Sequence, residues 1–73
     1  MEFEKISIKE EFIRLDSAMK LANLVVTGGH AKIVIQNGEV KVNGEVCKMR
    51  GKKLYKGDKV EFEGNGFTVI WKF

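Results

Sequence analysis

Six cationic side chains lie within residues 48–59, where the only acidic residue is Asp58. They give this basic segment a local net charge of +5 and are Lys48, Arg50, Lys52, Lys53, Lys56 and Lys59. Arginine can form a forked pair of hydrogen bonds with a phosphate or a guanine edge, whereas lysine acts as a point charge. Such a segment is suited to binding a polyanion, and the simpler alternative is a solvated surface loop.

A second candidate anion site lies at the start of an expected helix, in the sequence Thr27-Gly28-Gly29-His30. Unpaired N–H groups at a helix start favour an anion, and Lys32, one turn further along, would reach the same ligand. Alternatively, Thr27 only caps the helix and the glycines only let the chain pass close to the sheet. The glycine spacings of a dinucleotide-binding fold and of a phosphate-binding loop are both missing.

No set of residues typical of catalysis or metal binding is apparent. His30 is the single histidine, and no cysteine or second histidine lies at metal-ligand spacing from it. We therefore expect no enzymatic activity, cofactor, metal or small-molecule substrate, with His30 on the surface and Cys47 a buried structural thiol. Tyr55 would either stack on an unpaired base or close the core. Trp71 and the phenylalanines follow strand alternation and are expected in the core.

The composition is that of one small folded domain, expected to cover residues 1–73. Of the 73 residues, 44% are hydrophobic and 32% are charged. The net charge is only +3. Residues 14–59 contain ten basic and four acidic residues, so the positive charge is concentrated in the middle of the chain. The single cysteine indicates a reducing, cytoplasmic compartment. The charged first residues do not resemble a signal peptide, and no apolar run is long enough to span a bilayer, so no membrane partner is expected.

Hydrophobic spacing predicts an α+β fold in which two short helices pack on a small, curved antiparallel sheet. Strands are expected at residues 3–8, 39–42, 45–47, 60–63 and 67–73. The turns between them include Asn43-Gly44, Lys56-Gly57-Asp58 and Gly64-Asn65-Gly66.

The two helices are expected at about residues 15–24 and 29–37. Asp16 or Ser17 would cap the first helix, Thr27 the second, and Gly38 would end the second. The side chains expected on their buried faces are Ala18, Leu21, Ala22 and Val25, then Ala31, Val34 and Ile35.

Many residues of this chain match the residue types and the spacing of a known family pattern. They are Arg14-Leu15-Asp16, Leu21, Thr27, Ala31-Lys32, Ile35, Gly38, Val40, Val42-Asn43-Gly44, Val46, Leu54, Gly57-Asp58 and Val60. With this set the chain resembles the S-four-type RNA-binding domain, also called the alpha-L motif, over a core of residues 14–62. The sequences Gly28-Gly29-His30-Ala31-Lys32 and Arg50-Gly51-Lys52-Lys53 are similar to its short, free-standing bacterial branch.

The resemblance implies non-enzymatic binding of structured RNA through the second helix and the adjoining loop. Ribosomal RNA or a ribosome-assembly particle is the expected partner, tRNA an alternative, and a monomer the expected state. From the resemblance and the charge pattern together, the expected RNA-binding residues are Thr27, Gly28, Gly29, Lys32, Asn43, Lys48, Arg50, Lys52, Lys53 and Lys56. Many members have an arginine at the position of Gly28, so the Lys48–Lys53 loop is expected to supply that phosphate contact.

Three alternatives stay open from the sequence. The first is a protein-interaction module that docks on an acidic partner surface. Duplex DNA in place of RNA is a variant of the nucleic-acid hypothesis. A small enzyme has the least support, because no acid–base pair stands out.

Overall fold

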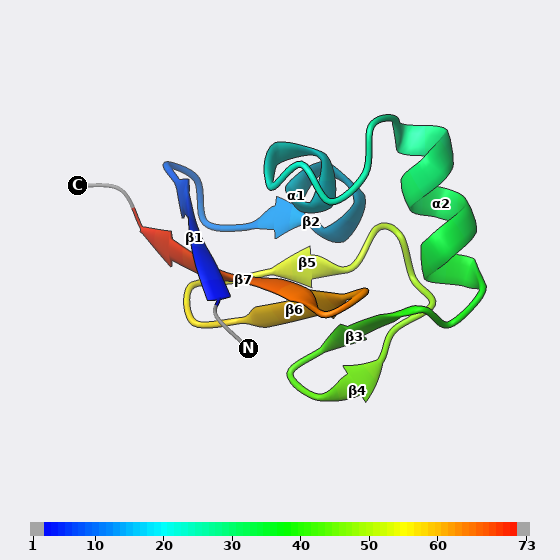
Figure 1. Cartoon of the computed structure of the whole chain (residues 1–73). Coiled ribbons are helices and arrows are strands. Elements are labelled where there is room, and N and C mark those ends of the chain that lie inside the picture. The colour runs from blue at the N-terminus through cyan, green and yellow to red at the C-terminus, as the bar shows by residue number, and fades with distance from the viewer. Residues whose placement is uncertain (1–2, 72–73) are drawn as a thin grey trace.

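A computed structural model describes residues 3–71, which form two helices and two sheets (Figure 1). The helices are α1 (Leu15–Leu21) and α2 (Gly28–Gln36). The strands are β1 (Phe3–Ile8), β2 (Ile13–Arg14), β3 (Val40–Val42), β4 (Glu45–Val46), β5 (Lys53–Leu54), β6 (Lys59–Phe62) and β7 (Asn65–Trp71). The predicted α+β class is confirmed. No helix within residues 3–71 is both long and apolar enough to cross a membrane.

The larger sheet has the strand order β1-β7-β6-β3-β4, and its β1–β7 pair is parallel while the other pairs are antiparallel. The sequence predicted an antiparallel sheet throughout. The β6–β7 hairpin sets the direction of β7, and β1 then joins the edge of β7 from the far end of the chain. No local signal in β1 specifies that direction. A second, two-stranded sheet pairs β2 with β5 and was not predicted.

One hydrophobic core lies against the inner face of the larger sheet. The predicted alternation of buried and exposed residues in β3 and β6 is confirmed. The buried side chains are Val40, Val42, Val60 and Phe62. The buried face of α2 is also as predicted: Ala31, Val34 and Ile35.

The prediction for α1 was partly wrong. Its buried residues are Leu15, Ala18 and Met19, whereas Leu21 is 57% exposed. The helix ends earlier than predicted because Asn23 takes a left-handed conformation, with φ of 60°. The N–H groups of Asn23 and Leu24 then bond to the carbonyls of Lys20 and Met19, which is a Schellman motif. The same motif ends α2, where Gly38 supplies the left-handed residue as predicted.

Two tight hairpins shape the larger sheet. Asn43 and Gly44, with φ of 52° and 86°, form the predicted turn between β3 and β4. The last turn was misplaced, because Glu63 and Gly64 make it and Asn65 and Gly66 already belong to β7. Gly66 must lack a side chain, since a Cβ there would lie 2.7 Å from the Phe3 ring and 2.9 Å from the Val60 carbonyl.

Two residues predicted to be buried lie nearer the surface. Trp71 is 48% exposed, so its predicted place in the core was wrong. It pairs with Ile8, the last residue of β1, and therefore sits at the end of both strands. Cys47 follows β4 rather than belonging to it and is half-buried against the core. The predicted continuation of the last strand through Phe73 lies outside the described residues.

Candidate nucleic-acid interface

The Lys48–Lys53 loop is docked on the start of α1. The backbone N–H groups of Leu15 and Asp16 donate to the carbonyls of Lys52 and Arg50, at 2.8 and 3.1 Å. A further bond of 3.1 Å from Lys52 N to Met49 O closes a turn with Arg50 and Gly51 at its tip. The loop is therefore held by the helix, because its carbonyls satisfy N–H groups that would otherwise lack a partner.

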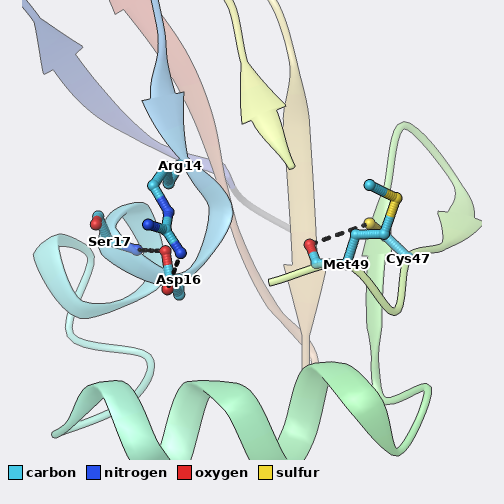
Figure 2. A network of polar contacts seen from close by, with 5 residues as sticks. All are labelled: Arg14, Asp16, Ser17, Cys47 and Met49. Atoms are coloured by element: carbon cyan, nitrogen blue, oxygen red, sulfur yellow. Dashed lines mark hydrogen bonds and ion pairs between the residues drawn. The ribbon is translucent and has the colours of Figure 1, made fainter. Parts of the chain in front are cut away.

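This docking explains why the predicted side-chain cap of α1 is absent. The N-cap residue is Arg14, and its side chain makes no capping bond. The Asp16 carboxylate accepts two hydrogen bonds, one from the backbone N–H of Ser17 at 2.8 Å and one from Nη2 of Arg14 at 3.2 Å (Figure 2). Because loop carbonyls occupy the first N–H groups of α1, this helix start is not an anion site.

Pairing of β2 with β5 adds a cation that the sequence analysis missed. Arg14 lies opposite Lys53 in the two-stranded sheet. Its guanidinium also borders the loop, because a Cβ on Gly51 would lie 3.7 Å from Nη2 of Arg14. We call Arg14, Arg50, Lys52 and Lys53 the basic cluster. Arg14 stood in the family pattern, but its distance along the chain from residues 48–59 concealed its place in this cluster.

Little negative charge opposes the basic cluster. Within residues 3–71 the one ion pair joins Arg14 Nη2 to Asp16 Oδ2 at 3.2 Å, and the Arg14 side chain stays 52% exposed (Figure 2). A pair this exposed contributes at most about 1 kcal/mol and leaves the guanidinium open to other ligands. Lys53 places its ammonium 4.9 Å from the centre of the Phe12 ring, and Arg50 and Lys52 are exposed.

The other cations of the basic segment lie elsewhere. Lys48 reaches the C-terminal end of α2, where its Cε lies 3.3 Å from the position of a Cβ on Gly38. The ammonium Nζ of Lys56 lies 5.9 Å from the centre of the Trp71 ring at the end of β7. The ammonium Nζ of Lys59 lies 5.6 Å from the centre of the Phe3 ring. The structure thus brings together half of the six predicted cations and spreads the remainder to either side.

The start of α2 has the geometry that the sequence predicted. The Thr27 hydroxyl accepts a hydrogen bond of 3.0 Å from the His30 N–H, which confirms the cap. Gly28, Gly29, His30 and Lys32 are exposed. A Cβ on Gly28 would meet no heavy atom within 4 Å, so the alternative that this glycine allows close passage by the sheet is wrong.

Asn43 occupies a different environment from the basic cluster. Its side-chain nitrogen donates to the Asp58 carboxylate at 3.1 Å, and its side-chain oxygen accepts from the Lys59 N–H at 2.9 Å. The other Asp58 oxygen accepts from the Tyr55 N–H at 2.8 Å. Both ends of the Asn43 amide therefore hold two turns together, and its predicted RNA contact stays a prediction.

No group of three or more His, Cys, Asp or Glu side chains is arranged to hold a metal ion in the part of the chain from Phe3 to Trp71. Cys47, which directly follows β4, places its Sγ 3.8 Å from the carbonyl oxygen of Met49 (Figure 2).

Comparison with known proteins identifies the family. The family model described as the S4 domain matches residues 6–70. The protein named "Probable ribosome maturation protein RlbA" of Bacillus subtilis (strain 168) is 49% identical over 66 residues, which cover 89% of this chain and 93% of that protein. "Putative RNA-binding protein YbcJ" of Escherichia coli (strain K12) is 34% identical over 62 residues, covering 85% and 89%.

A solved structure agrees with this family assignment. The solution structure of YbcJ from Escherichia coli, described as revealing an alpha-L motif involved in RNA binding, matches with a TM-score of 0.72 and 31% identity. The match covers 96% of this chain and 90% of that one. The resemblance inferred from the spacing of sequence elements such as Val42-Asn43-Gly44 and Gly57-Asp58 is confirmed, and the chain belongs to the S4 domain family.

Proposed function

We propose that this protein binds structured RNA through the basic cluster, without a catalytic step, and that its partner is ribosomal RNA or a ribosome-assembly particle. The observation that carries the proposal is the docking of the Lys48–Lys53 loop on α1, which gathers Arg14, Arg50, Lys52 and Lys53. The names of the two relatives, one a ribosome maturation protein and one an RNA-binding protein, support the same conclusion.

The chemistry of the cluster suits a folded phosphate backbone. Two arginines can each form forked hydrogen bonds with phosphate oxygens, and two lysines add point charges. Phosphate contacts of this kind supply affinity but carry no base sequence information. Selectivity would then come from the shape of the RNA, as is common for recognition of paired RNA.

The remaining predicted residues would form outer contacts. The start of α2, with Thr27, Gly28, Gly29 and Lys32, offers exposed backbone N–H groups and a positive helix end to a further phosphate. Lys48 and Lys56 lie on either side of the basic cluster and would contact a longer RNA. Asn43 would act indirectly, by holding the turn that precedes β6.

A salt titration tests the proposal. If the basic cluster neutralises four phosphates, log K for ribosomal RNA should fall against log salt with a slope of roughly −2.8 to −3.6. Transfer RNA and duplex DNA serve as competitors that distinguish the expected partner from the alternatives. A protein-docking module would instead be retained on its partner after nuclease treatment.

A matched pair of triple variants locates the site. Replacing Arg50, Lys52 and Lys53 with alanine should weaken RNA binding by orders of magnitude and reduce the slope by about 2–3. The control replaces Lys5, Lys41 and Lys59, which share the outer face of the larger sheet, and removes the same charge. Equal losses in both triple variants would show that only net charge matters and would refute the site.

A further inference from the structure

An open groove with apolar walls lies directly beside the basic cluster. It has a volume of about 580 Å³ and runs between the β1–β2 connection and α1. Its apolar wall consists of Ile8, Phe12, Ile13 and Leu21. Arg14 lines the groove and also belongs to the basic cluster, so the two features share a cationic edge.

Phe12 lines the groove, and the ring of Tyr55, which is not a lining residue, packs against it. The Phe12 and Tyr55 ring centres are 6.1 Å apart, with a tilt of 50° between the planes. Tyr55 is 44% exposed, so it does not close the core, which was one of the two predictions for it. Its backbone N–H is bonded to the Asp58 carboxylate at 2.8 Å, which fixes the position of the residue.

The groove and the rings are suited to one kind of ligand. Phe12 lies under the Lys53 ammonium, 4.9 Å from the ring centre, so an aromatic surface and a phosphate-binding cation are adjacent. Every nucleobase has a π face that stacks on an aromatic ring, and its flanking phosphates require cations close by. Glu10, which also lines the groove, offers acceptors to the amino group of a base.

We propose that this groove receives an unpaired base of the bound RNA, stacked on Phe12 with Tyr55 packed behind that ring, and with its flanking phosphates on Arg14 and Lys53. The proposal rests on the proposed function and extends it, because it names the RNA feature that is recognised: a bulged or looped-out nucleotide beside a paired stem. Leu21, exposed although apolar, would be covered by the base.

The test compares two hairpin RNAs that differ only in a single bulged nucleotide. Wild-type protein should bind the bulged hairpin about fivefold or more tightly than the fully paired one. When 2-aminopurine occupies the bulge, its emission should change on binding because the base becomes stacked on the protein. Both measurements use the full chain and defined RNA.

Variants assign the preference to the rings. Tyr55→Leu and Phe12→Leu should bring the ratio of the two affinities towards one while leaving binding of the paired hairpin nearly unchanged. Tyr55→Phe should keep the ratio. Phe3→Leu is the matched control, because Phe3 carries a similar lysine contact, with Lys59, and does not line the groove. Thermal melts confirm that each variant is folded.

The outcomes separate this inference from the proposed function. If wild-type protein binds both hairpins equally and with the same salt dependence, the proposed function stands and the base site is refuted. An unchanged ratio in Tyr55→Leu and Phe12→Leu also refutes the site and leaves the groove to another occupant, such as an apolar protein segment. If neither hairpin is bound although ribosomal RNA is, the base site is refuted and the proposed function stands, and if none of these RNAs is bound, both proposals fail.

Discussion

The side-chain amide of Asn43 donates a hydrogen bond of 3.1 Å to the carboxylate of Asp58, which lies 15 positions later in the chain. The same amide accepts a bond from the Lys59 N–H, and the same carboxylate accepts one from the Tyr55 N–H. Asn43-Gly44 and Gly57-Asp58, two separate elements of the family pattern, are therefore halves of one network. The network fixes the turn between β5 and β6 against the β3–β4 hairpin.

We expect Asn43 to contribute to stability rather than to RNA affinity. Asn43→Gly removes two hydrogen bonds and should lower the free energy of unfolding by about 1–2 kcal/mol. Asn43→Ala should cost roughly 1 kcal/mol more, because alanine is disfavoured at the positive φ of this residue. Urea unfolding gives both values. A loss of RNA affinity with unchanged stability would instead identify Asn43 as a contact residue.

Asp16 should weaken RNA binding, because its carboxylate is the one acidic group paired to the basic cluster among residues 3–71. Asp16→Asn keeps an acceptor for the Ser17 N–H and removes the charge. RNA affinity should rise several-fold at low salt, while the free energy of unfolding falls by about 0.3–1 kcal/mol because a negative charge at a helix start is lost. Glu61→Gln, on the outer face of the sheet, is the control and should leave the affinity nearly unchanged.

Gly28 allows a direct test of the departure from the usual family arginine. The position is exposed, has room for a side chain and does not have a positive φ. Gly28→Arg should tighten RNA binding and steepen the salt slope by about 0.7–0.9, the effect of one added phosphate contact. Gly28→Ala is the control. It raises helix propensity as Gly28→Arg does but adds no charge, so it should change stability and leave RNA affinity unchanged. If the two variants bind RNA alike, the start of α2 does not face the RNA.

Gly66 should be intolerant of any side chain. Gly66→Ala places a Cβ 2.7 Å from the Phe3 ring and 2.9 Å from the Val60 carbonyl, and overpacking of this kind costs about 1–3 kcal/mol. Adding Phe3→Ala should recover only part of that loss, since the Val60 backbone cannot move aside. If thermal melts showed full recovery of stability in the double variant, the Phe3 ring alone would be the reason that residue 66 must be glycine.

Local features of this protein were determined by the sequence itself. Thr27 caps α2, Gly38 ends it, and Asn43-Gly44 makes a tight hairpin, because each depends on hydrogen bonds or φ values of a few adjacent residues. The end of α1 also depends on a local signal, the left-handed conformation of Asn23. The sequence prediction did not use this signal and placed the end of the helix too late. The spacing of these signals was also enough to identify the family.

Contacts between distant segments were decided only by the tertiary structure. The direction of β1 depends on β7, and the exposure of Trp71 depends on where β1 stops. The start of α1 is capped by carbonyls from residues 50 and 52, and this same docking brings Arg14 beside the basic loop. Such partners are separated by dozens of positions, so hydrophobic periodicity and local propensity contain no information about which of them meet.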